Sequence, residues 1–249
     1  MKQTKDIFST QAATYAAYRP TYPDTLYDFL FSIAPAFNKA WDCGTGNGQN
    51  ARRIAERFGK VYATDISEQQ ILNAVQKPNI DYSVQRSEQT NFPDNSFDLI
   101  TIATALHWFD FDAFYNEVNR VAKDGAVIAA WAYAPFRSGN EIDKIVDEFC
   151  YGTLGHYWDP ERKWVDEEYK TIPFPFEEIP HPQFTINVQW TFEHAIGYFN
   201  SWSSVQHYIR KHNANPVDML SPLLKPYWEG ITVKELKIPV FFRAGRINK

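Results

Sequence analysis

A chain of 249 residues can fold as one large domain or two small ones, and its 44% hydrophobic content is enough for a sizeable core. The net charge of −5 disfavours a protein that covers nucleic acid, because such proteins usually carry a basic surplus. Cys43 and Cys150 are too few for a disulfide framework, and no apolar stretch approaches the roughly 20 residues that cross a membrane.

The first segment of the chain, Met1 to Tyr15, is polar and lacks the apolar run of a signal peptide. We therefore expect a cytoplasmic protein that binds neither nucleic acid nor a membrane. The residues around Tyr15, Tyr18 and Arg19 are predicted to form a helix that Pro20 ends.

Short apolar runs then alternate with helical patterns from about residue 38 to 133. Near-continuous apolar runs are typical of strands buried on both faces of a parallel sheet. The runs are Lys39–Cys43, Lys60–Asp65, Ile80–Gln85, Phe97–Ala105 and Ala126–Tyr133. Three helical faces lie between them, formed by Ala51, Ile54, Ala55 and Phe58, by Ile71, Leu72 and Val75, and by Phe114, Val118, Val121 and Ala122. This alternation predicts an open, doubly wound α/β sheet.

Beyond residue 133 the chain is irregular and rich in aromatic residues, and five of its six histidines and nine of its fifteen prolines follow residue 150. We expect a helix over residues 138–154, a loop over 156–182 and a helical region over 192–212. Strands are predicted at Phe184–Trp190, where apolar and polar residues alternate, and at Val233–Phe242.

A glycine-rich loop, Asp42-Cys43-Gly44-Thr45-Gly46-Asn47-Gly48, joins the first predicted strand to a helix. Glycines at such a place let the backbone turn sharply and approach a ligand closely. The dinucleotide pattern G-x-G-x-x-G fails because Gln49 stands at its third glycine, and no Gly-Lys-Ser/Thr follows for a P-loop. An acidic residue before the glycines suits a ligand with a cationic amine and no pyrophosphate, and S-adenosylmethionine has both properties.

A second acidic residue, Asp65, ends the second predicted strand, nineteen residues beyond Gly46. At that distance a carboxylate can accept hydrogen bonds from both ribose hydroxyls of a nucleoside ligand. The order of strand, acid, glycines, helix, strand and second acid is more specific than a glycine turn alone.

From this loop onward the chain resembles the class I S-adenosylmethionine-dependent methyltransferases. The residues that carry the resemblance are Asp42–Gly48, Asp65, Pro93–Asp98 and Ala105–Trp108. Phe8, Ala12, Tyr15 and Tyr18–Pro23 make it most similar to the small-molecule branch that includes trans-aconitate methyltransferase. The resemblance implies a Rossmann-like, mostly parallel sheet of seven strands with helices on both faces. It also implies one methyltransferase domain with a cofactor lid (1–37), a cofactor-binding core (38–133) and a substrate-binding insertion with the last strands (134–249).

The same resemblance assigns cofactor contacts along the chain. Asp42, Gly44 and Gly46 would face the methionine part, and Asp65 with Ile66 the ribose and adenine. The adenine edge would be read by Ser87, Glu88 and Gln89, and because many relatives carry Asp where this chain has Ser87, that contact can shift to Glu88 or to backbone. Thr104, at the end of the fourth predicted strand, is assigned to the cofactor as well. Tyr15 and Arg19 belong to the segment that caps the cofactor, where an arginine can pair with its carboxylate.

His107 and Trp108 follow the fourth predicted strand, at the edge where open α/β sheets bind ligands. His107 is a candidate general base or substrate-orienting residue, with a structural role as the alternative. Trp108 is expected to form a wall of the methyl-transfer site. Aromatic residues that could line the acceptor pocket, or simply pack in the core, are Trp131, Tyr133, Tyr157, Trp158, Trp202 and His207.

The function that we expect is methyl transfer to a small molecule, with a carboxylate as the favoured acceptor because it is already ionised. N-methylation, O-methylation of a hydroxyl and a non-catalytic cofactor-binding protein are the alternatives, and either a monomer or a homodimer is compatible with the sequence. No metal is expected, because Asp143, Asp147 and Glu148 have no His or Cys beside them and are interpreted as a solvated helix face.

Overall fold

The computed structural model describes residues 18–249. Five strands run parallel in the order β3 (Ile80–Val84), β2 (Lys60–Asp65), β1 (Lys39–Cys43), β4 (Phe97–Ala103) and β5 (Ala122–Tyr133). β8 (Lys234–Arg246) is antiparallel to β5, and its outer edge pairs with β6 (Glu177–Glu178) near its end and with β7 (Phe184–Trp190) near its start. Because β6 and β7 share one edge, the sheet has seven positions, which confirms the predicted seven-stranded, mostly parallel, Rossmann-like sheet.

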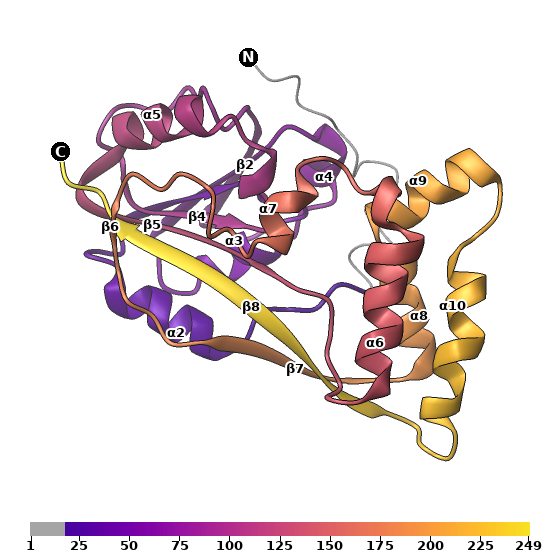
Figure 1. Cartoon of the computed structure of the whole chain (residues 1–249). Helices are drawn as coiled ribbons and strands as arrows, with labels where there is room; N and C mark the ends of the chain where they lie inside the picture. Colours follow the sequence, from indigo (N-terminus) through magenta and orange to yellow (C-terminus); the bar gives the residue numbers. More distant parts are fainter. Residues whose placement is uncertain (1–17) are drawn as a thin grey trace.

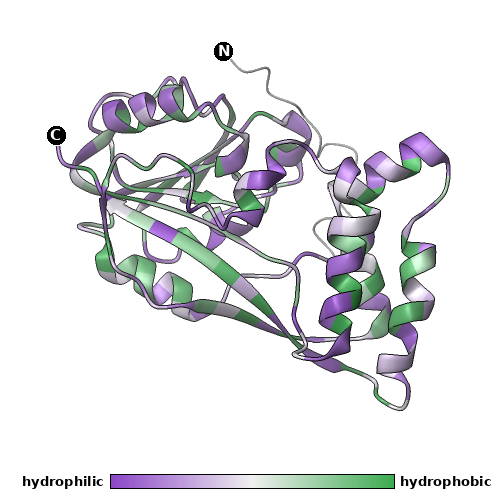
Figure 2. Ribbon diagram, in the orientation of Figure 1, coloured by the Kyte–Doolittle hydropathy of each residue, from purple (hydrophilic) through white to green (hydrophobic). Residues whose placement is uncertain are grey.

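Helices cover both faces of this sheet, as Figure 1 shows for α5 (Phe111–Val121) on one side and α2 (Asp24–Ile33) on the other. Each face has its own apolar core. Leu26 and Leu30 of α2 belong to one core, and Phe114 and Val118 of α5 belong to the other. Colouring by hydropathy shows that helices such as α2 and α5 carry apolar and polar residues together (Figure 2).

Short helices and helical turns connect the strands. They are α3 (Gln49–Ile54), α4 (Glu68–Leu72) and η2 (Leu106–Trp108). The capping pattern predicted at Ser67 is confirmed, because the Ser67 hydroxyl accepts a hydrogen bond from the backbone N–H of Gln70 at 3.3 Å. α3 is shorter than predicted and gives way to turns before Gly59.

A group of helices from the second half of the chain lies at the end of the sheet where β5 ends (Figure 1). It comprises α6 (Glu141–Asp147), the π-helical segment η3 (Glu148–Thr153), η4 (Gly155–Tyr157), α8 (Phe192–Asn200), α9 (Ser203–His212), α10 (Val217–Leu224) and η5 (Lys225–Trp228). The segment predicted as a loop, 156–182, also holds the short helix α7 (Arg162–Asp166). These helices place the second half of the chain beside the carboxyl ends of the parallel strands.

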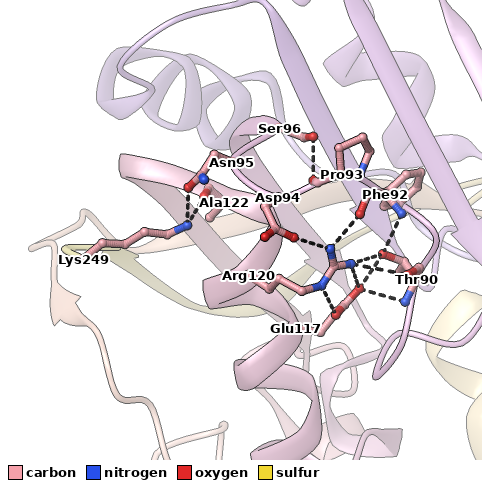
Figure 3. A network of polar contacts seen from close by, with 10 residues as sticks. All are labelled: Thr90, Phe92, Pro93, Asp94, Asn95, Ser96, Glu117, Arg120, Ala122 and Lys249. Carbon is pink, nitrogen blue, oxygen red and sulfur yellow. Dashed lines mark hydrogen bonds and ion pairs between the residues drawn. The ribbon is translucent and has the colours of Figure 1, made fainter.

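The Pro93–Asp98 motif turns out to be bound into a polar network that fixes the start of β4 (Figure 3). Arg120 of α5 donates to the Phe92 carbonyl and to the Asp94 carboxylate, both at 2.7 Å, and pairs with Glu117. Burial alone would raise the pKa of Glu117, but hydrogen bonds from Arg120 and Thr90 outweigh it and hold that pKa below its ordinary value. The network orients the loop that leads into β4.

Candidate functional site

A cavity of about 320 Å³ lies at the carboxyl edge of the parallel strands, where the strand order reverses between β1 and β4. Open α/β sheets bind ligands at this switch point. Of the residues predicted from the sequence, those that line the cavity are Arg19, Gly44, Gly46, Asp65, Ile66, Ser87, Glu88, Thr104 and Trp108. The structure therefore brings residues predicted after the first, second, third and fourth strands to a single cavity.

The glycine loop between β1 and α3 forms the floor of this cavity. Gly44, Gly46 and Gly48 have φ values of +67°, +56° and +79°, which L-residues rarely adopt. A Cβ on Gly44 would lie 2.6 Å from the Cβ of Ala105, whereas a Cβ on Gly46 would meet nothing within 4 Å. Gly44 is thus required by close packing against the segment after β4, and Gly46 leaves open space above the loop for a ligand.

Asp42 lies beneath this loop and does not line the cavity. Its carboxylate accepts hydrogen bonds from Thr45 Oγ1 at 2.5 Å, Asn50 Nδ2 at 2.6 Å and Thr101 Oγ1 at 2.9 Å. Burial raises the pKa of Asp42 to about 6, although these hydrogen bonds act in the opposite direction. Asp42 therefore joins the loop to α3 and β4 rather than facing the cavity directly.

Asp65, at the end of β2, faces the cavity and also shapes the loop. Its Oδ2 accepts from the Gly46 backbone N–H at 2.8 Å, and its Oδ1 accepts from the Ser67 backbone N–H at 2.9 Å. An ionised carboxylate can accept about four hydrogen bonds, so these two are compatible with further bonds to ligand hydroxyls. The geometry couples the glycine loop to a carboxylate that lines the cavity.

Two of the three residues predicted at the adenine edge line the cavity. Ser87 is buried, and Glu88 accepts from the Asp110 backbone N–H at 3.2 Å while its other oxygen lies 3.6 Å from Arg86 Nε. Gln89 forms a bridge with Arg86 and is not part of the lining. This end of the cavity is polar and fixed by backbone contacts.

The opposite end is formed by the N-terminal segment and the tips of β4 and β5. Arg19 donates to the Tyr133 phenol at 2.9 Å and to the Ser201 carbonyl at 3.1 Å, and so joins its segment to β5 and to the end of α8. Tyr22 and Glu161 also line the cavity. Sequence reasoning did not select these two, although Tyr22 lies inside the motif that carried the resemblance.

Thr104 and Tyr22 meet at this end, with their hydroxyl oxygens 2.5 Å apart. Thr104 has a φ of +57°, and its backbone N–H donates to the Trp131 carbonyl at 2.7 Å. Such a φ is a genuine outlier for a β-branched residue. The Tyr22 ring packs edge-on against Trp131, with the ring centroids 5.8 Å apart.

His107 lies outside the cavity lining, although the adjacent Trp108 is part of it. The His107 ring is buried, and its Nδ1 lies 2.7 Å from the phenol oxygen of Tyr169. Tyr169 and the preceding Glu168 have φ values of +60° and +54° in the irregular segment before β6. Among the aromatic residues considered for the acceptor pocket, Tyr133 lines the cavity and the others do not.

One predicted site residue, Tyr15, lies outside the described residues. Within residues 18–249, no group of three or more His, Cys, Asp or Glu side chains is arranged to hold a metal ion. The helices of the same part of the chain include none that is both long and apolar enough to span a bilayer.

Comparisons with known proteins agree with this geometry. The model of a methyltransferase domain matches residues 41–130. A Dictyostelium discoideum protein provisionally named a methyltransferase is 33% identical over 89% of this chain and 86% of its own length. A solved structure from Anaeromyxobacter dehalogenans, provisionally named a type II methyltransferase, is 39% identical with a TM-score of 0.86, over 93% of this chain and 99% of its own. The Haemonchus contortus phosphoethanolamine N-methyltransferase 2 in complex with S-adenosyl-L-methionine shares the fold at 17% identity and a TM-score of 0.52, over 100% of this chain and 61% of its own.

Proposed function

Because this chain belongs to the class I S-adenosylmethionine-dependent methyltransferases, we propose that it methylates a carboxylate oxygen of a small molecule. Its cofactor is S-adenosylmethionine. We further propose that its acceptors resemble those of the trans-aconitate methyltransferase branch, as the N-terminal motif through Pro23 suggests.

The cavity over the glycine loop supports the cofactor assignment. In this proposal Gly44 and Gly46 approach the methionine part, Asp42 holds the loop from beneath, and Asp65 accepts hydrogen bonds from the ribose hydroxyls. Ile66 would pack on the ribose and adenine, and the adenine edge would meet Ser87, Glu88 and Gln89. Arg19 and Tyr15 would act at the carboxylate end of the cofactor, and Thr104 would lie near the sulfonium, on the side where the acceptor meets the methyl group. The open space above Gly46 is the feature that an incoming cofactor requires.

When bound, S-adenosylmethionine supplies a methyl group that is already activated by a sulfonium. The acceptor oxygen forms its bond to the methyl carbon as the carbon–sulfur bond breaks, and that electron pair remains on sulfur. The protein has to align the acceptor and exclude water, and such alignment can contribute on the order of 7–11 kcal/mol. Trp108 and Tyr133 would serve as walls that hold the acceptor in line.

The proposed class of methyl acceptor rests on the residues that line the cavity. The described lining residues include no histidine, cysteine or lysine, and His107 points its Nδ1 to Tyr169 instead. An amine or hydroxyl acceptor benefits from a general base, whereas a carboxylate with a pKa near ~4 is ionised at neutral pH. Asp24, Asp65, Glu88 and Glu161 also line the cavity and are carboxylates that can act as bases, so the lining lacks a histidine base but not every base. We favour the carboxylate acceptor because it needs no base.

The proposal also divides the chain by task. Residues 1–37 would form the cofactor lid, 38–133 the cofactor-binding core, and 134–249 the acceptor-binding insertion with the last strands. Cys43 and Cys150 are both buried as free thiols, which is compatible with the cytoplasmic location that we propose. We propose a monomer or a homodimer as the working unit.

Two measurements test the function. S-adenosylhomocysteine is expected to bind with micromolar affinity by calorimetry and to raise the melting temperature, while NAD does neither. Labelled S-adenosylmethionine is then incubated with a panel of carboxylic acids, phenols and amines. Methyl esters of carboxylic acids are the expected products, and turnover confined to amines or phenols would refute the acceptor class.

A further inference from the structure

The contact between Tyr22 and Thr104 joins two hydroxyls from distant parts of the chain. Tyr22 belongs to the segment before α2, and Thr104 directly follows β4. Both residues line the cavity, and their oxygens lie 2.5 Å apart. The pair joins the segment before α2 to the tip of β4.

The backbone of Thr104 is held in an unfavourable conformation. A φ of +57° is rare for a β-branched residue, and such conformations persist where surrounding contacts determine them. Two contacts do so here. The Thr104 N–H donates to the Trp131 carbonyl at 2.7 Å, and the next residue, Ala105, packs against Gly44. Thr104 lines the cavity in this strained conformation, and its hydroxyl contacts Tyr22.

The hydrogen-bonding capacity of the pair sets what it can bind. Each hydroxyl carries one proton and two lone pairs. We assign the shared proton to the Tyr22 phenol, because a phenol is a stronger acid than an aliphatic alcohol. The Thr104 hydroxyl then accepts from Tyr22 and keeps its own proton for a third group, and acceptance of one hydrogen bond strengthens donation of the next.

We propose that the Thr104 hydroxyl, polarised by Tyr22, donates a hydrogen bond to the methyl acceptor and orients its nucleophilic group. This assignment rests on the proposed function, because a carboxylate has a second oxygen that can be held while the first is methylated. Thr104 touches the acceptor, and Tyr22 is a positioning residue that acts through Thr104. Because Tyr22 belongs to the segment before α2, alignment of the acceptor depends on the position of that segment.

Variants of nearly unchanged shape distinguish the effect of each hydroxyl from the effect of side-chain packing. Tyr22→Phe removes the phenol oxygen, Thr104→Val keeps the β-branched shape without a hydroxyl, and Thr104→Ser restores the hydroxyl. Tyr115→Phe is the matched control, because it removes a buried phenol from the core on the α5 face, away from the cavity. Each variant is compared by thermal melting, by calorimetry with S-adenosylhomocysteine, and by kcat and KM on the acceptor that the wild-type protein methylates best.

We expect Thr104→Val to lower kcat/KM about tenfold to a hundredfold, and Tyr22→Phe about tenfold. The double variant should be no slower than Thr104→Val alone, since the two hydroxyls act as one unit. Thr104→Ser should recover most of the rate, and Tyr115→Phe should leave it unchanged. The dissociation constant of S-adenosylhomocysteine should stay within about twofold of wild type in every variant.

Other results would overturn the inference in recognisable ways. A loss of S-adenosylhomocysteine affinity in parallel with the rate would mean that the pair binds the cofactor. If the losses in kcat/KM of the two single variants add in the double variant, or if there is no loss, then Tyr22 does not act through the Thr104 hydroxyl. If amines or phenols are methylated and carboxylates are not, the proposed acceptor class fails while the variant rates on those acceptors still decide the role of the pair. If S-adenosylhomocysteine binds but no acceptor is methylated, the proposed function fails and this inference fails with it.

Discussion

The Nδ1 atom of His107 lies 2.7 Å from the phenol oxygen of Tyr169, and both side chains are buried. This contact ties the tip of β4 to the irregular segment before β6, and it turns the histidine away from the cavity lining that Trp108 joins. From this position His107 can hold the segments around the site in place, but its Nδ1 atom does not face the cavity.

We predict that His107→Ala lowers the free energy of unfolding by about 1–3 kcal/mol, because it removes a hydrogen bond between two buried side chains. Turnover on a carboxylate should fall by no more than about a hundredfold, and the acidic limb of the pH–rate profile should remain. Denaturant unfolding and the pH dependence of kcat provide the two readouts. A loss beyond this range with a vanished limb near pH 6–7 would instead identify His107 as a general base.

Asp65→Ala should weaken S-adenosylhomocysteine binding about tenfold or more, because it removes the acceptor of ligand hydroxyl bonds and of the Gly46 N–H. Calorimetry measures the change. The control is Asp81→Ala, which removes a half-exposed carboxylate of β3 that pairs with Lys60 outside the cavity. Equal affinities for both variants and wild type would show that Asp65 does not contact the cofactor.

Asp42→Asn should change how stability depends on pH. The folded-state pKa of Asp42 is raised from 3.8 to about 6, so the folded protein binds a proton more readily than the unfolded chain. Its contribution to stability is therefore full below pH 3.8 and is lost as the pH rises through 6, a change on the order of 2–3 kcal/mol. Unfolding of wild type and variant at pH 5 and 7.5 should show the variant gaining relative stability at the higher pH. A difference that does not vary with pH would contradict the raised pKa.

Arg120→Ala should destabilise the protein by about 1–3 kcal/mol, because Glu117 would keep a buried carboxylate without its cation. The double change Arg120→Met with Glu117→Leu should recover part of this loss, since it removes both charges. Chemical denaturation measures both variants. Lys144→Ala, which breaks an exposed ion pair with Glu141, should change stability by less than ~0.5 kcal/mol and serves as the control. If Arg120→Ala lowers the free energy of unfolding as little as Lys144→Ala does, the network contributes no more than an exposed ion pair.

The strands of the core could be predicted because their apolar runs are short and sharply bounded. The bounds of Lys39–Cys43, Lys60–Asp65 and Phe184–Trp190 are the same in the structure. α2 was not predicted, because it follows Pro23 without a side-chain cap and mixes apolar residues on several sides. α10 was not predicted either, and it contains Pro222 within its length. Tertiary packing decides both helices, and local propensity does not reveal that packing.

The location of the site could be predicted from the sequence, but the orientation of each side chain in it could not. Strand ends and glycines located the cavity, since both follow from chain order. Whether Asp42 points into the cavity depends on Asn50 and Thr101, and whether His107 does depends on Tyr169. Hydrogen-bond partners that are distant in sequence, such as Thr101 for Asp42, cannot be inferred from local residue spacing. Tyr22, in contrast, lies within the Tyr18–Pro23 motif, and its hydroxyl made it a possible candidate for the site.

The position of β8 between β5 and the β6–β7 edge has a consequence during synthesis. β5 and β7 leave the ribosome before β8 does, so each carries an unpaired strand edge until residues 234–246 follow. Unpaired edges are templates for pairing with other chains, and partly folded nascent chains aggregate through them. The last strand to be synthesised is therefore the one that pairs with both edges, so the sheet can be completed only after residues 234–246 have emerged.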